Sequence, residues 1–341
     1  MVFLNKMTKP TIIDISKATG FSKSTISKAL NNSKEISKKT KEKITNYARE
    51  INYKPNFYAS HLRKNIIKNV AIVIPDVLNF YFAKVLKGAQ QEFFSRGYDL
   101  MCFFNDESVS KEKKILDKLK NGNIAGLMIS QAKNPFSENI SKKLKKLQAY
   151  SIPILMFDRV TSDFKCDKVF IDDFQTTYDC VKHLVSRGKR KISLVSPIHD
   201  TLIGEKRFEG YKKALKSENI QFDSSLYIPL TSGDTIQSEI TKLVLSKKID
   251  AIICIEQHTT VAIQSLLLNL GFKIPKEIAI LGFTDGPLFK YTIPSITSVD
   301  QHGEYMGKLS AKILMKRIEN KNSNNYVEEK VPTSLNIRKS T

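Results

Sequence analysis

The chain has 341 residues, too many for one ordinary hydrophobic core, so two or three domains are expected. Its 55 lysines and arginines outnumber its 34 aspartates and glutamates, which gives a formal net charge of +21. No segment approaches about 18 uninterrupted apolar residues, and the first ten residues lack the apolar run of a signal peptide. We therefore expect a soluble, cytoplasmic protein with no membrane partner.

The composition gives no indication of a metal, a cofactor or a disulfide framework. The chain has four cysteines, and no two of them form the C-x-x-C pair that a zinc site or a redox centre would use. We expect reduced thiols that fill core positions, with neither a bound metal nor a cofactor. The cysteines are Cys102, Cys166, Cys180 and Cys254.

A short amphipathic helix is predicted at Thr11–Thr19. Thr11 followed by Asp14 is typical of a capping box at a helix start, and Gly20 is a typical helix end. Apolar residues recur between them at the spacing of one helical face, which favours a helix packed on one side. These apolar residues are Ile12, Ile15 and Ala18.

A second helix follows, with Ser22 as its expected cap. Its inner face is apolar and its outer face is polar. Two short helices joined by a glycine turn form a helix-turn-helix, whose second helix enters the major groove of DNA and reads base edges with its first residues. The inner face holds Ile26, Ala29 and Leu30, and the outer face holds Lys23, Ser24, Ser27 and Lys28.

A third helix from Ser37 is expected to hold the first two together. Its apolar residues recur at the helical spacing, which is enough to complete a three-helix headpiece. The alternative is that Lys23 and Lys28 belong to an ordinary solvated helix surface, where lysines usually lie. The apolar residues of the third helix are Ile44, Tyr47, Ala48 and Ile51.

The segment after the third helix is too short to be stable by itself. Pro55 ends the helix, because the residue before a proline is pushed out of the α region. Asn56 can then cap a helix over 57–63, but so short a helix does not persist in water unaided. We expect this segment to fold only when a partner holds it.

Basic residues are concentrated in the first 64 residues, which hold 14 lysines and arginines against 4 acidic residues. The other 277 residues hold 41 basic and 30 acidic residues, so the net charge per residue is about four times higher in the first segment. This distribution is expected where phosphates are bound.

These stretches resemble the LacI/GalR family of transcriptional regulators. The resemblance rests on TIIDISKATGFSKSTISKALN, ISKKTKEKI and INYKPNFYASHLR, and on further fragments along nearly all of the chain. It implies that 56–63 is a hinge helix that folds on operator binding and inserts Leu62 into the minor groove, a wedge that bends the DNA. It also implies contacts to DNA by Thr11, Ser22, Lys23, Ser24, Thr25, Lys28, Asn31, Ser37, Thr40, Asn56, Ala59 and Leu62.

From Asn69 onward, short apolar runs alternate with amphipathic stretches, which is typical of βαβ units. Continuous apolar strands indicate parallel sheets covered on both faces, so the fold class is α/β with doubly wound lobes. Strands are predicted near 70–74, 98–103, 124–130, 152–157, 168–171, 191–196, 226, 251–255, 278–283 and 335–338. Helices are predicted near 80–96, 111–120, before 150, and near 174–187, 204–217, 235–245, 259–271 and 302–319.

Two such halves resemble the periplasmic-binding-protein fold, in which the chain crosses three times between two lobes. The resemblance implies crossings near Arg159, near Thr292 and between Asn320 and Val331, so that the helix at 302–319 returns to the first lobe. The predicted domains are a headpiece at 1–55, a hinge and linker at 56–68, a first lobe at 69–160 with 292–320, and a second lobe at 161–291 with 321–341.

The sequence carries no catalytic motif that we recognise. It has no Walker motif, H-E-x-x-H, G-x-S-x-G or G-x-G-x-x-G, so we do not expect an enzyme. A periplasmic solute receptor of the same fold would need a signal peptide and no headpiece, and the sequence meets neither condition.

Ligands of such sheets bind at the carboxyl ends of the strands, in the cleft between the lobes. Asp76 follows the first strand. Tyr81 and Phe82 match the aromatic pair of the family, which stacks on a sugar or base ring; the alternative is that both rings belong to the core. These three residues are predicted to contact the effector.

Two charged positions also match the family. Asp158 corresponds to an aspartate that faces the cleft, with a buried ion pair to Arg159 as the alternative. Arg207 aligns with an arginine that grips effector oxygens, for which a forked guanidinium is well suited. We predict that Arg207 binds the ligand and does not serve the fold.

Two departures from the family affect the effector. Glu256 and Gln257 stand where many members have Asn-Asp, and Thr284 and Asp285 stand where many have Asp-Asp. One carboxylate acceptor is therefore absent and another is displaced, which leaves open whether the effector is a simple neutral hexose. All four residues are included in the predicted effector site.

The sequence thus predicts a DNA-binding regulator of transcription whose two-lobed domain binds a small metabolite, a sugar or a sugar derivative, and so controls operator affinity. Repression of carbohydrate-related genes is the favoured activity. A homodimer is expected, because no heptad extension of the kind that makes some family members tetramers follows the last strand. The alternative is a corepressor-dependent repressor, or an activator, with a non-sugar effector.

Overall fold

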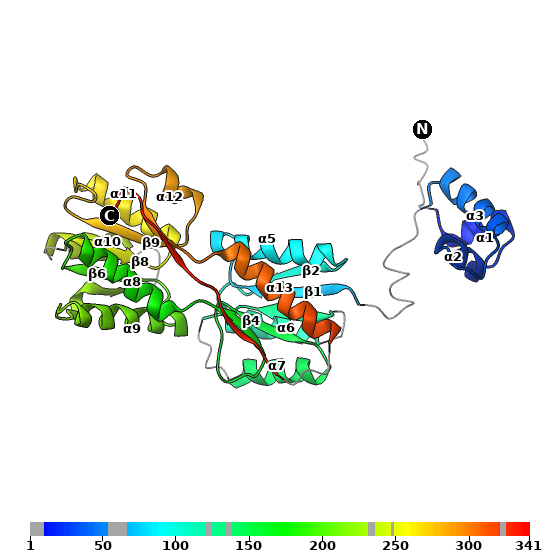
Figure 1. The fold of residues 1–341 in the computed structure, drawn as a ribbon, viewed down its shortest axis with the longest axis horizontal. Coiled ribbons are helices and arrows are strands. Elements are labelled where there is room, and N and C mark those ends of the chain that lie inside the picture. The colour runs from blue at the N-terminus through cyan, green and yellow to red at the C-terminus, as the bar shows by residue number, and fades with distance from the viewer. Residues whose placement is uncertain are drawn as a thin grey trace, which may run out of the picture. The chain divides into compact units, whose positions relative to one another are not determined.

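The computed structural model describes residues 10–53, 67–120, 124–133, 138–230, 236–246, 249–320 and 325–341. The chain separates into two compact units, 1–67 and 68–341 (Figure 1). The predicted hinge residues Asn56, Ala59 and Leu62 lie outside the described residues.

The small unit contains the three predicted helices, α1 (Ile12–Thr19), α2 (Lys23–Leu30) and α3 (Lys38–Glu50). Gly20 ends α1 at a φ of 76°, a left-handed conformation that favours glycine. The prediction that Ala18 faces the core is wrong: Ala18 is exposed, and Phe21 packs against the core from the turn. The buried core consists of Ile15, Ile26, Ala29, Ile44 and Ala48.

The first lobe of the large unit is a parallel sheet of six strands. Its strands, in spatial order, are β11 (Glu328–Lys330), β5 (Asp167–Phe170), β4 (Ile154–Phe157), β3 (Gly126–Ile129), β1 (Asn69–Ile74) and β2 (Asp99–Phe104). Its helices are α5 (Phe80–Ser95), α6 (Val109–Leu119), α7 (Glu138–Ala149) and α13 (Gly303–Glu319). Side chains alternate along a strand, so Val70 and Ile72 face α5 and α13, whereas Ala71 and Val73 face α6 and α7.

The second lobe repeats this arrangement with another sheet of six strands. In spatial order they are β12 (Ser334–Asn336), β10 (Thr297–Asp300), β9 (Ala279–Phe283), β8 (Ala251–Cys254), β6 (Ile192–Ser196) and β7 (Tyr227–Pro229). Only β12 is antiparallel to its neighbour, and it confirms the predicted closing strand. One face packs on α8 (Asp173–Ser186) and α9 (Leu202–Ser217), and the other on α10 (Ile236–Ser246), α11 (Gln257–Asn269) and α12 (Pro287–Tyr291).

The chain changes lobes later than predicted. β5 pairs with β4 and β11, so the first lobe extends past 160, and the turn of Asp158 and Arg159 lies within it. β10 pairs with β9, so the second lobe extends past 291. β11 pairs with β5, so this part of the segment 321–341 belongs to the first lobe and not to the second. The sequence hides these strands because TSVD and EEK are short and polar, so no apolar run marks them.

Helices α5 and α13 lie side by side in Figure 1 because two glycines let their backbones approach closely. A Cβ at Gly88 would lie 2.0 Å from the carbonyl oxygen of Glu304, and one at Gly307 would lie 2.0 Å from that of Val85. This contact holds α13 on the first lobe, as predicted.

Three of the four cysteines are buried thiols, as predicted, and burial raises the pKa of Cys166 to about 12. The prediction is wrong for Cys102, which is exposed because β2 is the edge strand of its sheet. The described residues contain no group of three or more side chains that could hold a metal ion.

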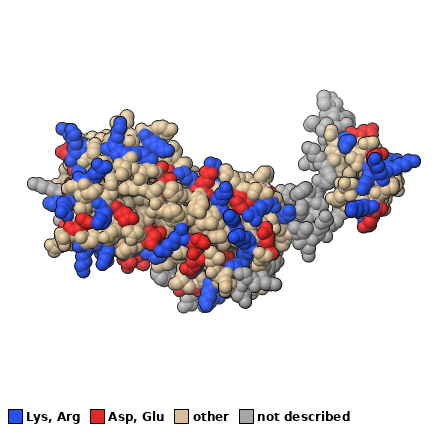
Figure 2. Space-filling model, in the orientation of Figure 1, with Lys and Arg blue, Asp and Glu red and all other residues tan. Residues whose placement is uncertain are grey.

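The net positive charge of the chain is not confined to one unit. Figure 2 shows lysines and arginines spread over the visible face of the large unit as well as the small one. No helix in the described part of the chain is both long and apolar enough to cross a membrane.

We expect Gly307→Ala to separate α5 from α13. The added methyl would overlap the carbonyl oxygen of Val85, so the helices must move apart and lose packing. The free energy of unfolding, measured by urea denaturation, should fall by about 3 kcal/mol. Lys312→Ala, at an exposed position of the same helix, should change it by less than about 0.5 kcal/mol. Equal losses in the two variants would contradict the glycine contact.

Candidate functional site

The residues of helix α2 that are predicted to contact base edges of DNA lie on its exposed side. Ser22 caps the helix, and its hydroxyl accepts a hydrogen bond from the amide of Thr25 at 3.1 Å. Lys23, Ser24 and Lys28 are exposed. The side chains at the start of α2 are therefore accessible to a groove of DNA.

The N-termini of α2 and α3 can each take an anion. Ser37 caps α3 by accepting the amide N–H of Thr40 at 3.3 Å. Neither helix has an acidic residue in its first turn, so the positive end of each helix dipole is left for phosphate oxygens. Helix α1 differs, because hydrogen bonds from the hydroxyl and the amide of Thr11 reach Asp14 and lower the pKa of its carboxyl.

Lys28 has a partner within the protein. Its ammonium forms an ion pair with Glu35, in the loop before α3, and both side chains are well exposed. An exposed pair of this kind contributes at most about 1 kcal/mol, so DNA can displace Glu35. Every described residue of the predicted DNA site is at least partly exposed: Thr11, Ser22, Lys23, Ser24, Thr25, Lys28, Asn31, Ser37 and Thr40.

The two lobes of the large unit meet in a narrow cleft. Its cavity volume is about 20 Å³, room for about one water molecule, so the lobes lie close together. Lys84 of the first lobe donates to the carbonyl of Asp285 at 3.1 Å, and Lys133 donates to that of Pro197 at 2.9 Å. The cavity is lined by Gln131, Ala132, Asp158, Arg159, Val160 and Phe170 of the first lobe, and by Asp173, Thr201, Leu202, Ile203 and Lys206 of the second.

Arg207 is buried on the second-lobe side of the cleft. Its Nε donates to Asp173 at 2.8 Å, and one Nη donates to the carbonyl of Ile255 at 3.2 Å. Its guanidinium also lies over the ring of Phe283, 4.2 Å from the centroid. Arg207 therefore has partners within the second lobe, and its predicted role in binding the effector stays a prediction.

Asp173 is the buried partner of Arg207. Burial raises the pKa of the Asp173 carboxyl to about 6, although the positive charge of Arg207 opposes this change. The charge of Asp158, from the first lobe, raises the pKa further. The two carboxyls therefore interact across the cleft.

Tyr81 and Asp158 form the first-lobe side of this cluster. Asp158 is 7% exposed, and its Oδ2 accepts a hydrogen bond from the Ser130 hydroxyl at 3.4 Å. Burial raises the pKa of Asp158 and, together with the charges of Asp158 and Asp173, that of Tyr81. The structure thus brings the predicted residues Tyr81, Asp158 and Arg207 to one place.

Arg159 pairs with Glu107 and not with Asp158, so the ion-pair alternative for Asp158 is wrong. One Nη of Arg159 donates to Glu107 at 2.7 Å, and the other donates to the carbonyl of Gln131 at 3.2 Å. Glu107 also accepts the amide N–H of Lys133 at 3.1 Å. These bonds fix the loop after β3 against the first lobe.

A second buried carboxyl holds the same loop. Glu112 is 1% exposed, and its Oε2 accepts the amide N–H of Ala132 at 2.7 Å and the side-chain amide of Asn105 at 2.8 Å. Burial raises the pKa of Glu112 to about 7. The backbone around Gln131 is therefore held on both sides.

Buried polar atoms that have no hydrogen-bond partner gather at the cleft edges. Such atoms are few in folded proteins, and each one needs an explanation, such as a ligand or a water. Among the described residues, every side chain with such an atom, apart from Ser310, lies at or beyond the carboxyl end of a strand. These side chains are Tyr81, Gln131, Arg159, Ser196, His199 and Gln257.

The remaining predicted effector residues have partners within the protein. Asp76 is exposed and accepts the amide N–H of Leu78, and Phe82 lies in the core of the first lobe. Glu256 caps α11. Thr284 donates to Gln301 at 3.1 Å. Asp285 accepts hydrogen bonds from Ser298 and Arg338, which outweigh burial and lower its pKa.

Of the residues that line the cavity, the sequence predicted only Asp158, and Gln131 and Asp173 are among those that it missed. Gln131 comes two residues after β3, so the rule that ligands bind beyond the carboxyl ends of strands could have found it. Asp173 stands at the start of α8, where an acidic residue is common for reasons of helix stability alone. Its partner, Arg207, is 34 residues away, and no sequence signal joins them.

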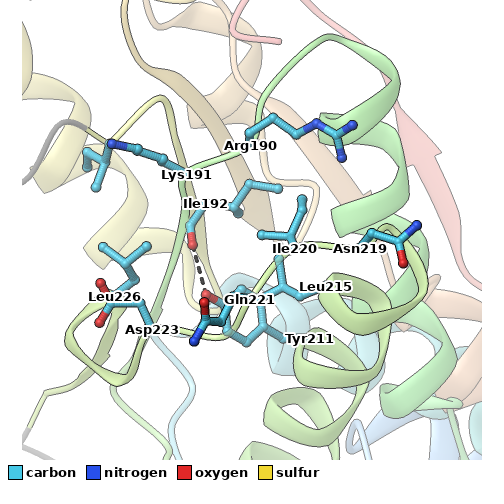
Figure 3. Close-up of a pocket in the computed structure, with 11 residues that line it drawn as sticks. Arg190, Lys191, Ile192, Tyr211, Leu215, Asn219, Ile220, Gln221, Asp223 and Leu226 are labelled. Carbon is cyan, nitrogen blue, oxygen red and sulfur yellow. Dashed lines mark hydrogen bonds between the residues drawn. The ribbon is translucent and has the colours of Figure 1, made fainter.

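A larger cavity, of about 430 Å³, lies at the amino end of β6, away from the cleft (Figure 3). Two of its polar side chains already have partners: the Tyr211 hydroxyl donates to the carbonyl of Ile192 at 2.8 Å, and Arg190 donates to that of Glu218 at 3.0 Å. None of the predicted residues lines it. We therefore place the candidate small-molecule site in the cleft.

Comparisons with known proteins agree with this organisation. Residues 11–56 match bacterial regulatory proteins of the lacI family, and residues 181–341 match a periplasmic binding protein-like domain. The NTD biosynthesis operon regulator NtdR of Bacillus subtilis (strain 168) is 28% identical, over 97% of this chain and 100% of its own length.

Two solved structures share the fold. The lac repressor dimer bound to operator and the anti-inducer ONPF has a TM-score of 0.83 at 19% identity, over 98% of this chain and 99% of that chain. The complex of the transcriptional regulator CelR with cellobiose has a TM-score of 0.72 at 21% identity, over 98% of this chain and 100% of that chain.

The buried carboxyl of Glu112 should make stability depend on pH. Its pKa rises from 4.5 to about 7 on folding, so the folded protein binds this proton more tightly than the unfolded chain does. The free energy of unfolding should therefore fall by roughly 3 kcal/mol as the pH rises through this range. Glu112→Gln keeps an acceptor for the Ala132 amide and should remove this loss.

Urea denaturation at about pH 4.5 and about pH 8 measures the effect. Glu329→Gln, at an exposed position of β11, is the matched control and should leave the pH dependence as it is in the parent. A Glu112→Gln variant that loses as much stability with rising pH as the parent would show that Glu112 is ionised at little cost.

Proposed function

The chain belongs to the lacI family of bacterial regulatory proteins, and from this we propose that it represses carbohydrate-related genes in response to a small metabolite bound between its lobes. The family makes it a DNA-binding regulator of transcription. Beyond this, we propose that the regulation is repression and that the effector is a sugar or a sugar derivative.

The exposed start of α2 supports the DNA-binding half of the proposal. Lys23, Ser24 and Lys28 lie on its accessible side and are proposed to reach base edges. The capped N-termini of α2 and α3, without acidic residues, are proposed to bind backbone phosphates. Asn56, Ala59 and Leu62 are proposed to contact the minor groove on the strength of the family resemblance alone.

By its resemblance to the family, Lys28 occupies a position where an arginine is expected. An arginine fork can bind both O6 and N7 of a guanine, whereas a lysine donates from a single point. We therefore propose that Lys28 reads one base pair in each half-site, and reads it less sharply than an arginine would.

The proposal that an effector binds between the lobes rests on the buried polar atoms at the cleft that have no hydrogen-bond partner. Tyr81, Gln131 and Gln257 each bury a polar atom with no partner among the described residues, and a ligand rich in hydroxyls would supply partners. Asp158 and Arg207 lie beside Tyr81. The cellobiose bound by CelR is a ligand of this chemistry.

We propose that the protein acts as a homodimer. Exposed apolar side chains at and beside α12 are typical of an interface, and the lac repressor structure is a dimer. Two headpieces would then read the two halves of a near-palindromic operator. The exposed fractions are 49% for Leu288, 80% for Tyr291 and 86% for Ile293.

Operator binding should depend strongly on salt. A dimer that neutralises roughly ten phosphates should give a slope of log K against log salt near about −9, because each contact releases a counterion. Fluorescence anisotropy of a labelled operator duplex, from about 50 to 200 mM salt, measures the slope. A slope shallower than about −3 would rule out the proposed role of the headpiece.

Lys28→Ala should relax the preference for one base pair per half-site by about 1–3 kcal/mol, because only a base contact distinguishes sequences. Lys38→Ala, at the start of α3, is the control and should weaken binding to all duplexes alike. Competition between the operator and single-base variants measures both effects. If Lys28→Ala weakened every duplex equally, Lys28 would be a phosphate contact.

A further inference from the structure

The amide of Gln131 is buried without any partner. The side chain is 2% exposed, and neither its Nε2 nor its Oε1 forms a hydrogen bond within the described residues. It is the only described side chain that has two such unsatisfied buried atoms. It also lines the cavity between the lobes.

The backbone around Gln131 is held in place by hydrogen bonds, so a poorly fixed loop does not explain the unpaired amide. The carbonyl of Gln131 accepts from Arg159 at 3.2 Å, and the next two amides donate to Glu112 at 2.7 Å and to Glu107 at 3.1 Å. The protein thus uses two acidic side chains and an arginine to fix a loop whose own amide side chain is left without a partner.

Another buried glutamine of this chain shows the ordinary arrangement. Gln264 is also 2% exposed, but its Nε2 donates to the carbonyl of Pro294 at 2.6 Å. Leaving a buried amide unpaired lowers stability, and groups that are costly to the fold are often retained for binding. Gln131 therefore differs from a structural glutamine in the same protein.

The charges around Gln131 restrict the ligand group that it can meet. Arg159 is paired with Glu107, and Arg207 is paired with Asp173, so each guanidinium at the cleft already has a carboxylate. Asp158 adds a further buried carboxyl on the same cavity. In the lining of the cavity, Arg159 and Lys206 balance Asp158 and Asp173, so the lining has no net formal charge. Such a lining favours an uncharged ligand, whose hydroxyl groups can both donate and accept.

We propose that Gln131 is a specificity-determining residue of the effector cleft, and that its amide binds adjacent hydroxyls of an uncharged sugar. The amide N–H donates to one hydroxyl oxygen, and the amide oxygen accepts from a neighbouring hydroxyl. The Nε–H of Arg159, also unpartnered, donates beside it. This inference rests on the proposed effector cleft.

The test compares Gln131→Leu with Gln264→Leu in the full-length protein. Without ligand, Gln131→Leu should melt at the same temperature as the parent or higher, because an unpaired amide is replaced by an apolar group of similar size. Gln264→Leu should melt several degrees lower, because it loses the hydrogen bond of a buried amide to the carbonyl of Pro294. Equal decreases would make Gln131 a structural residue and overturn the proposal.

Ligand binding is measured by calorimetry with cellobiose, ribose and gluconate as probes. The parent should bind at least one of the uncharged sugars more tightly than gluconate, and Gln131→Leu should weaken that sugar at least tenfold while Gln264→Leu keeps the affinity of the parent. Unchanged sugar affinity in Gln131→Leu, preference for gluconate, or no sugar binding by the parent would each overturn the proposal.

Operator binding separates this inference from the proposed function. Gln131→Leu should bind the operator duplex with the salt dependence of the parent, because Gln131 belongs to the large unit. If both proteins bind the operator and Gln131 proves irrelevant to sugar, only the role of Gln131 fails. If neither protein binds a duplex specifically, the proposed DNA-binding function fails.

Discussion

Closure of the two lobes depends on burying charge at the carboxyl edges of two parallel sheets. Asp173 and Arg207 compensate each other within the second lobe, so their burial does not require the first lobe. Asp158 comes from the first lobe, and its bond from Ser130 is long, at 3.4 Å. Closing the cleft therefore places a poorly compensated carboxyl next to Asp173, and a ligand that donates hydrogen bonds to Asp158 would lower that cost.

The carboxyl edges of the two sheets can also give the effector a different affinity for different arrangements of the lobes, which regulation requires. The cleft has a volume of only about 20 Å³, so a sugar can enter only when the lobes move apart. A ligand that then satisfies Tyr81, Gln131 and Gln257 favours one arrangement of the lobes over another. If that arrangement also sets the spacing of two headpieces in a dimer, effector and operator affinities change reciprocally by the same factor.

The parts of the fold that the sequence predicted have local causes. Ser22 and Ser37 are recognisable as caps, and the apolar runs at β1, β4 and β8 are recognisable as buried strands, because residues close in sequence decide both features. The changeovers between lobes were misplaced because β10 and β11 depend on strands that are remote in the sequence. The cleft residues follow the same division: the position of Gln131 after β3 is a local feature, whereas the pairing of Asp173 with Arg207 arises only in the folded lobe.

In the headpiece, the serines that stabilise the helices are also proposed to contact DNA. Among its described residues the core holds five buried side chains, so the ends of its short helices matter for its stability. Ser22 and Ser37 each accept an amide N–H at a helix start, and each hydroxyl is also hydrogen-bonded to a threonine hydroxyl, that of Thr25 or Thr40. Each hydroxyl pair keeps one proton that can be donated to a phosphate. If the proposed phosphate contacts form, loss of either serine weakens both the fold and the complex, whereas Lys28, whose only described partner is the exposed Glu35, contributes little to the fold.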